Sequence, residues 1–165
     1  ETTEHGLMLL LTGCNKAQGY GISPPMPALD LPDWLAVYSP ESQWISLGNR
    51  DRTPEENQII LFRLALSQWE KNFKNNIQSS PECNKQWPIL KRKECHCGIW
   101  IKRARQEMLF EENTLQHIER THNAKHDIAS DLFNTYQAGN IDDARESLTK
   151  LQSAVECINN AFVSV

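Results

Sequence analysis

The sequence predicts a mostly α-helical protein in which residues 54–165 form an antiparallel, four-helix-like bundle. Apolar side chains recur every three or four residues in several long segments of this region, so each segment would carry one apolar face along a helix. Signals that start and stop helices stand between these segments. Because no amphipathic helix can bury its own apolar face, three or four of them should pack around a shared core.

The composition narrows the classes of protein to which the chain can belong. Of its 165 residues, 39% are hydrophobic and 23% are charged, and the formal net charge is -4. This balance is typical of a soluble folded protein and argues against a disordered chain or a surface that binds nucleic acid. The longest apolar run, residues 7–11, is much shorter than the roughly 20 residues that cross a bilayer. We therefore expect neither nucleic acid nor a membrane as a partner.

The region before the bundle is predicted to be a separate, mixed α/β segment. An amphipathic helix runs toward Cys14, and residues 18–22 suggest a short strand. The prolines that follow exclude a continuing helix or a central strand. A short helix is expected over residues 29–38, and the polar, aperiodic residues 39–53 are expected to form a linker.

The first helix of the bundle is predicted to start at Thr53. This residue can cap a helix, Pro54 suits the first helical position, and Glu56 completes a capping box. The helix should reach about Ile77 and bury one face, which consists of Ile59, Phe62, Leu66, Trp69 and Phe73. Two prolines between residues 79 and 88 then predict a loop.

Two further long helices are predicted after this loop. The first spans about residues 112–136 and ends at Gly139, with Asn140 as the cap of the next helix. Its apolar stripe contains Leu115, Ile118, His122, His126, Ala129, Phe133 and Tyr136. The second runs over residues 141–162 and presents Ile141, Ala144, Leu148, Leu151, Val155, Ile158 and Phe162. Gly98 interrupts the apolar pattern ahead of these helices.

The cysteines indicate a reducing compartment. There are five, an odd number, and Cys95 and Cys97 flank His96 instead of standing at regularly paired spacings. We therefore expect a cytoplasmic protein. The remaining cysteines are expected to be free thiols that pack as small apolar residues, namely Cys14, Cys83 and Cys157.

Residues 11–14 also resemble the cleavage site of a bacterial lipoprotein, which would make Cys14 a lipid anchor. Glu1 and Glu4 stand where a signal peptide carries positive charge, and the apolar stretch is shorter than such a peptide requires. These flanks argue against lipidation.

The spacing of one cysteine and two histidines points to a zinc site. His122 and His126 lie four residues apart, so on a helix their imidazoles project from the same side. The apolar stripe passes through both, and two buried imidazoles need polar partners. Cys95 precedes a glycine-bearing turn that can bring a thiolate to them, and thiolate with imidazole is the donor set that zinc prefers. Cys97, His96 or water would supply the fourth donor.

One alternative for His122 and His126 stays open. Pairs at this spacing also arise by chance, so His122 and His126 can be ordinary core histidines. His117 lies five residues before His122, roughly 140° around the helix, and is expected to face solvent.

Residues 59–162 resemble the chemoreceptor zinc-binding (CZB) domain, a small helical bundle of bacterial chemoreceptors and cyclic-di-GMP enzymes. A Cys-x-x-Gly-x-Trp turn matches Cys95, Gly98 and Trp100, and a His-x-x-x-His helix matches His122 and His126. A glycine followed by an acidic, alanine-containing helix matches residues 139–144. The resemblance implies a zinc site of three histidines and one cysteine.

The first histidine of that family stands three residues before a tryptophan on the opening helix. Here the tryptophan is Trp69 and the position three before it is Leu66. The chain therefore keeps three of the four implied ligands. Water, Cys97, His96 or a second protomer would complete the site.

The first 38 residues resemble the C-terminal end of an EAL-type cyclic-di-GMP phosphodiesterase domain. The matching residues, in order, are Glu1-Thr2, Gly13-Cys14, Gln18-Gly19-Tyr20 and Pro25-Met26-Pro27, with 31–34 closing the domain. The resemblance implies that Gln18 lines the nucleotide site of the parent enzyme. The metal-binding acidic residues and the catalytic lysine of that family would lie upstream of Glu1, so we expect no catalysis by this chain itself.

Together, the resemblances imply a C-terminal regulatory or sensory module of a bacterial cyclic-di-GMP phosphodiesterase. Zinc occupancy, or the thiol state of Cys95, would change the packing of the bundle and thereby the activity of the enzyme. The upstream phosphodiesterase domain would be its partner, and a homodimer is a further expectation. The alternative is a metal-free helical dimerisation or interaction domain of the same signalling protein.

Overall fold

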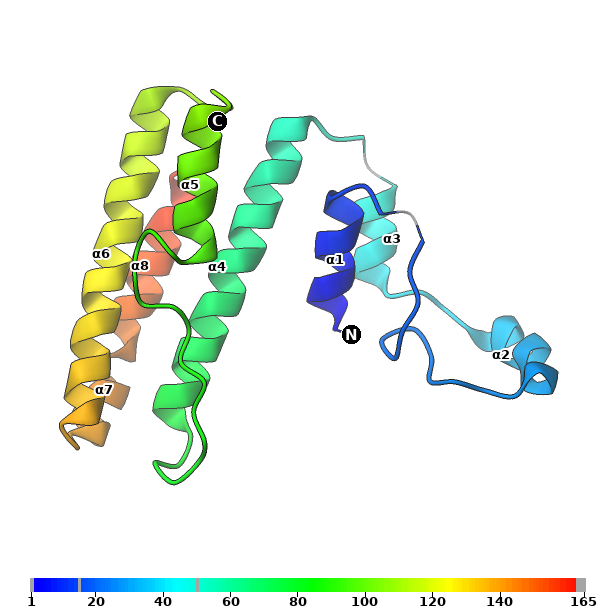
Figure 1. The fold of residues 1–165 in the computed structure, drawn as a ribbon, viewed down its shortest axis with the longest axis horizontal. Helices are drawn as coiled ribbons and strands as arrows, with labels where there is room; N and C mark the ends of the chain where they lie inside the picture. The colour runs from blue at the N-terminus through cyan, green and yellow to red at the C-terminus, as the bar shows by residue number, and fades with distance from the viewer. Residues whose placement is uncertain (1, 15, 50, 163–165) are drawn as a thin grey trace. The chain divides into compact units, whose positions relative to one another are not determined.

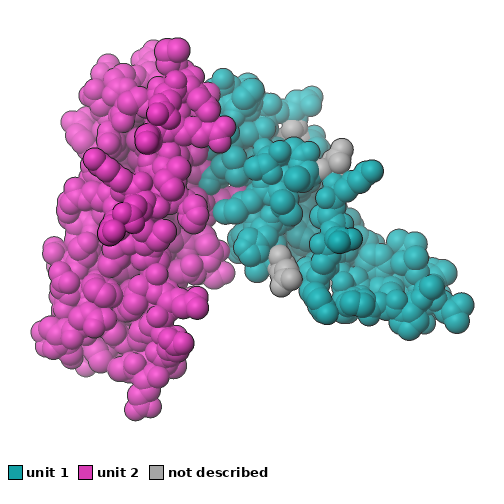
Figure 2. Space-filling view, in the orientation of Figure 1, with its two compact units in different colours: residues 1–61 teal, residues 62–165 magenta. Residues whose placement is uncertain are grey.

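The computed structural model describes residues 2–14, 16–49 and 51–162, and the chain divides into two compact units (Figure 2). Unit 1 comprises residues 1–61 and unit 2 comprises residues 62–165. Helix α4, Pro54–Gln78, begins in unit 1 and continues into unit 2. No helix in the described part of the chain is long and apolar enough to cross a membrane.

Unit 1 consists of short helices joined by irregular segments. In chain order these are α1 (Thr3–Leu11), the 3-10 helix η1 (Ala28–Asp30), α2 (Leu31–Val37) and α3 (Ser42–Gly48). Thr2 caps α1, because its hydroxyl accepts a hydrogen bond from the backbone N–H of His5. Helix α3 packs on α1 through Trp44, whose indole N–H donates to the Thr3 carbonyl over 2.9 Å. The helices predicted near the N-terminus and over residues 29–38 are confirmed.

The strand predicted for unit 1 is wrong. Residues 18–22 form turns and irregular backbone, and the described residues contain no strand, so the predicted α/β character is not seen. Gly19 adopts a φ of 138°, which favours a turn over a strand at this point. Helix α3 forms within residues 39–53, the segment that is predicted to be a linker. Its partner Thr3 lies 41 residues away in the sequence, so no local pattern announces this helix.

Unit 2 is the predicted helical bundle, and its successive long helices run in opposite directions (Figure 1). After α4 come α5 (His96–Gln106), α6 (Glu112–Gln137), α7 (Ile141–Glu146) and α8 (Leu148–Asn160). The mostly helical fold and its antiparallel order are as predicted. The last predicted helix differs in being divided at Ser147 into α7 and α8. The apolar stripe continues across the division through Ala144, Leu148 and Leu151, which are buried.

The predicted signals at the start of α4 and at the end of α6 are confirmed. Thr53 and Glu56 form the capping box: the Thr53 N–H donates to the Glu56 carboxylate over 2.8 Å, and the Glu56 N–H donates to the Thr53 hydroxyl over 3.2 Å. Helix α6 ends before Gly139, which has a φ of 87°. Glycine adopts this left-handed conformation without the steric cost that other residues incur.

Aromatic side chains fill the two ends of the bundle core. At one end, the ring of Phe62 packs edge-on against Trp100 and Phe162. At the other, Trp87 packs against Phe73, Phe133 and Tyr136. Trp87 comes from the irregular segment before α5, which follows the lower part of α4 in Figure 1. Because α5 has 11 residues while α6 has 26, this segment completes the side of the bundle that α5 leaves short.

Candidate metal centre

Helices α5 and α6 bring one thiol and two imidazoles together in the interior of unit 2. Cys95 is the N-cap of α5, and its Sγ accepts a hydrogen bond from the Gly98 N–H over 3.3 Å. His122 and His126 stand one turn apart on α6, with ring centroids 4.7 Å apart. All three side chains are 1% exposed. The sequence-predicted trio is therefore a buried cluster.

The donor atoms converge at distances that suit a single metal ion. Cys95 Sγ lies 3.1 Å from His122 Nε2 and 3.2 Å from His126 Nε2, and the three ligand atoms all lie within 4.8 Å of one another. Tetrahedral zinc would separate a sulfur and a nitrogen ligand by about 3.5 Å, given its usual bond lengths. A small outward movement of each side chain would therefore admit an ion, and the cluster can hold one.

The protonation state of the histidines suits metal binding. Burial lowers the pKa of His122 to about 3, and the charges of Lys125 and His126 act in the same direction. Burial and Lys125 likewise lower the pKa of His126 to about 3, against the effect of the Leu90 carbonyl. Both imidazoles are thus neutral at pH 7 and carry a free lone pair for a metal.

Gly98 allows the turn that presents Cys95. An added Cβ at this position would lie 1.9 Å from the Arg92 carbonyl oxygen, so a larger residue cannot be accommodated without moving the backbone. The Cys95 thiol also donates toward this carbonyl over 3.5 Å. Gly98 was expected to interrupt the helical pattern, but it lies in the first turn of α5. Glycine at this position allows the backbone of α5 to lie close to the backbone of Arg92.

Replacing Gly98 with alanine should therefore damage both fold and site. We expect a loss of about 1–3 kcal/mol in the free energy of unfolding, the usual cost of overpacking, together with weaker metal uptake because Cys95 would shift. Urea unfolding and metal titration would measure the two effects. Gly48→Ala in α3 is the control, because nothing lies within 4 Å of a Cβ there. Equal effects of the two substitutions would contradict this role for Gly98.

The structure does not bring the predicted fourth donors to the cluster. His96 is exposed, and Cys97, although buried, directs its Sγ to the Phe62 carbonyl at 4.0 Å. Burial raises the pKa of Cys97 to about 12, so its thiol stays protonated at pH 7. Leu66 is fully buried on α4 and offers no donor atom. Three candidate ligands remain among the described residues, namely Cys95, His122 and His126.

Sequence reasoning missed one residue next to the cluster, Lys125. Its side chain is fully buried, and its Nζ lies 3.6 Å from the centre of the Trp69 ring. The Trp69 ring also packs edge-on against the ring of His126, with the two ring centroids 5.3 Å apart. The indole N–H of Trp69 donates to the Ile89 carbonyl. Burial lowers the pKa of Lys125 to about 8. Its position three residues after His122 is the signal that would have placed it on the buried face.

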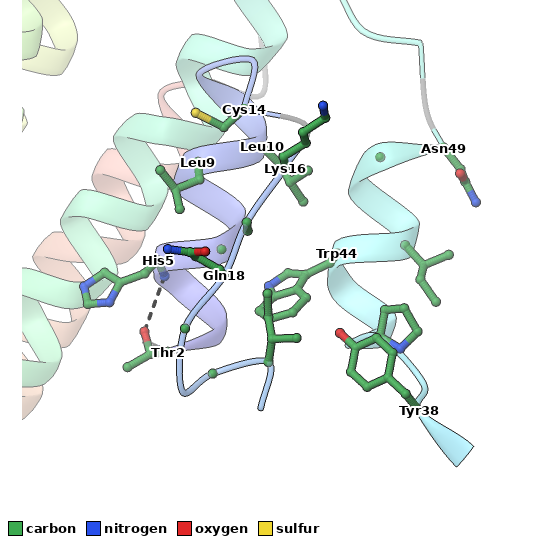
Figure 3. Close-up of a pocket in the computed structure, with 18 residues that line it drawn as sticks. Thr2, His5, Leu9, Leu10, Cys14, Lys16, Gln18, Tyr38, Trp44 and Asn49 are labelled. Carbon is green, nitrogen blue, oxygen red and sulfur yellow. Dashed lines mark hydrogen bonds between the residues drawn. The ribbon is translucent and has the colours of Figure 1, made fainter. Parts of the chain in front are cut away.

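The other predicted residues lie elsewhere. Gln18 is exposed in unit 1, where it lines a cavity of about 410 Å³ together with Tyr38 and Trp44 (Figure 3). His117 faces solvent, as predicted. The prediction of apolar packing is wrong for the remaining cysteines, because these free thiols are exposed: Cys14, Cys83 and Cys157.

The chain matches no family model, no curated protein and no solved structure.

Proposed function

We propose that residues 54–165 form a zinc-binding regulatory module of CZB type. The observation that carries this proposal is the convergence of Cys95, His122 and His126 at 1% exposure in the middle of a helical bundle. Thiolate and neutral imidazole favour zinc over magnesium or calcium, which prefer oxygen ligands.

A bound ion would act on the packing of the bundle. Cys95 starts α5, whereas both histidines belong to α6, so the metal would fix the start of one helix against the middle of the other. Arg92, three residues before Cys95, also forms an ion pair with Asp127 of α6. Metal binding favours one arrangement of α5 and α6 over another only if the metal has a higher affinity for that arrangement. This difference in metal affinity would couple zinc occupancy to the packing of the bundle.

Elemental analysis of the purified chain tests the zinc site. We expect about one zinc per chain after purification without chelator, and renewed uptake at neutral pH after the metal has been stripped. A protein that contains no zinc and takes none up would end the proposal of a zinc module.

We propose further that residues 1–38 belong to an EAL-type phosphodiesterase domain whose activity the module tunes in the cytoplasm. In the described residues of unit 1, Leu7 is the one side chain that is buried. Large apolar side chains there are exposed, among them Tyr20, Leu29, Leu35 and Val37. A segment with so little core needs an apolar surface to cover it. The need for such a covering surface supports the proposal that this segment belongs to a larger parent domain.

A longer chain that includes the preceding domain would test this regulation. We expect cyclic-di-GMP hydrolysis by the longer chain to change on zinc removal and to recover on zinc addition, whereas the 165-residue chain should hydrolyse none. If the chain binds zinc but hydrolyses cyclic-di-GMP at the same rate with and without it, the metal would have a structural role alone.

A metal-free interaction or dimerisation module is the second candidate. It is favoured by the two short contacts between the Cys95 thiol and the imidazoles, at 3.1 and 3.2 Å, which can satisfy these groups as hydrogen bonds. In that case chelator would change neither the thermal midpoint nor the oligomeric state of unit 2.

A further inference from the structure

A cavity of about 510 Å³ lies in unit 2 between α5 and α6, which run side by side in Figure 1. Its wall on α5 includes Gly98, Lys102 and Arg105, and its wall on α6 includes Glu119 and His122. These positions are three or four residues apart on each helix, so each helix contributes one face. Cavities that hold small molecules measure about 300–1,000 Å³, so this cavity is large enough for a ligand of that kind.

The cavity reaches the metal cluster at three points. His122, a member of the cluster, forms part of its wall. Gly98 and Arg92 also line the cavity, and both contact the third residue, Cys95. The Gly98 N–H donates to the Cys95 Sγ over 3.3 Å, and this thiol donates toward the Arg92 carbonyl over 3.5 Å. Because the donor side chains are only 1% exposed, an ion has to pass other side chains to reach them, and the cavity shortens that passage.

Positive charge predominates on the walls of the cavity. Four of the lining side chains are cationic and one is anionic, namely Arg92, Lys93, Lys102 and Arg105 against Glu119. Charges of this sign repel a hydrated zinc ion but attract an anion. A zinc ion held by a small molecule with several carboxylates travels in a complex of negative charge, so the walls attract zinc in this form.

The arginines and the lysines of the cavity differ in their partners. Arg92 pairs with Asp127 of α6. Arg105 pairs with Glu112 over 3.0 Å and with Glu119 over 2.9 Å. Among the described residues no ion pair is found for either lysine of the cavity, and both lysines are exposed. The charges of the lysines are therefore available to an incoming anion.

We propose that this cavity is the entry route to the metal cluster and that it receives zinc from small anionic carriers, molecules that hold the ion through carboxylate groups. This inference rests on the proposed function of the cluster as a zinc site. The carboxylates of the carrier meet Lys93 and Lys102 while the ion faces His122. During transfer the bonds from zinc to the carrier oxygens break, and bonds to the Cys95 Sγ and the two imidazole nitrogens form. The thiol proton passes to the freed carrier.

Release of zinc to two chelators tests this route, because uptake and release follow the same path in opposite directions. Nitrilotriacetate carries carboxylates and negative charge, whereas phenanthroline is uncharged. The zinc-loaded chain is mixed with an excess of either chelator, and the zinc that stays with the protein is measured over time. For the natural chain we expect the rate of release to rise with the concentration of nitrilotriacetate, because the chelator enters the cavity to remove the ion.

The variant Lys93→Gln with Lys102→Gln should respond differently to the two chelators. Clefts lined by one sign of charge raise association rates by about 10- to 1,000-fold. With two of the four cations removed, we expect nitrilotriacetate to extract zinc about three- to tenfold more slowly at low salt, and phenanthroline to extract it at an unchanged rate. The difference should vanish near 1 M salt, where the Debye length is about 3 Å. Lys71→Gln with Lys150→Gln is the control, because these exposed lysines of α4 and α8 lie outside the cavity.

A bulky side chain at Asn123, which also lines the cavity, tests the route independently of charge. Asn123→Phe should slow release to both chelators, whereas Ala124→Phe, at an exposed position of the same helix, should not. The equilibrium affinity for zinc should stay the same, because a narrowed route slows uptake and release alike. Thermal melts in chelator show whether each variant folds. If Asn123→Phe melts earlier, the comparison of the two chelators in the lysine variant still decides the matter.

Two results would overturn this inference and leave the zinc module standing. If the lysine variant released zinc to nitrilotriacetate as fast as the natural chain, or were slowed equally with both chelators, its lysines would not recognise an anionic carrier. If release from the natural chain were independent of chelator concentration, zinc would leave through a spontaneous opening of the bundle and not through the cavity. A natural chain that binds no zinc would overturn the proposed function itself, and this inference with it.

Discussion

Replacing Cys95 with serine should remove most of the stabilisation that zinc gives to unit 2. A ligand that binds only the folded state adds about 4 kcal/mol to the free energy of unfolding when its free concentration is a thousand times its dissociation constant. For a domain of about 100 residues this raises the thermal midpoint by at least about 10 °C. Serine leaves two imidazoles but no thiolate, so the gain on adding zinc should fall to a small fraction of that value. Thermal melts with zinc and with chelator measure the difference.

Cys157→Ser is the matched control for this substitution. Cys157 is an exposed free thiol in the same unit, so its loss should leave the zinc-dependent shift unchanged. If Cys95→Ser kept the full shift, the ion would have to bind elsewhere. If the natural chain showed no shift, a metal-free role for the cluster would be favoured.

The parts of the site that the sequence predicted are those set by local geometry. The repeat of an α-helix places His122 and His126 on one side whatever surrounds them, and the apolar stripe through them predicts their burial. Thr53 and Glu56 likewise form their capping box within a single turn. Local rules of this kind decide which residues share a face, so these predictions are confirmed.

The parts that the sequence did not predict depend on contacts between distant segments. Gly98 resembles a helix breaker until the Arg92 carbonyl is found against it. Lys125 resembles a solvated residue until Trp69, from another helix, covers it. Helix α3 is stabilised by Trp44 donating to the carbonyl of Thr3, a contact that no pattern within residues 39–53 reveals. Fold class was thus accessible from periodicity, whereas the surroundings of the metal cluster were not.

The metal-free bundle should become unstable in mild acid because of the same two histidines. The pKa of both His122 and His126 is lowered to about 3 in the folded state, first of all by burial, while in the unfolded chain it is about 6.5. Below pH 6.5 the unfolded chain therefore binds up to two protons that the folded bundle does not. Stability is fully present above that pH and falls as the pH drops toward 3, by as much as about 2.7 kcal/mol per pH unit for two protons. Since small domains are stable by only about 5–15 kcal/mol, unfolding should begin well above pH 3.

Urea unfolding in chelator between pH 7 and pH 4 would measure this slope. The variant with leucine at both positions, His122→Leu with His126→Leu, cannot bind these protons and should lose most of the pH dependence while remaining folded, since leucine is apolar and similar in size. The remaining slope would come from the carboxylates, which both proteins share. His117→Gln is the control, because His117 is exposed on the same helix and its loss should leave the slope as it is. An equally steep decline in the leucine variant would show that other groups cause the acid sensitivity and that the two imidazoles are accessible to protons in the folded bundle.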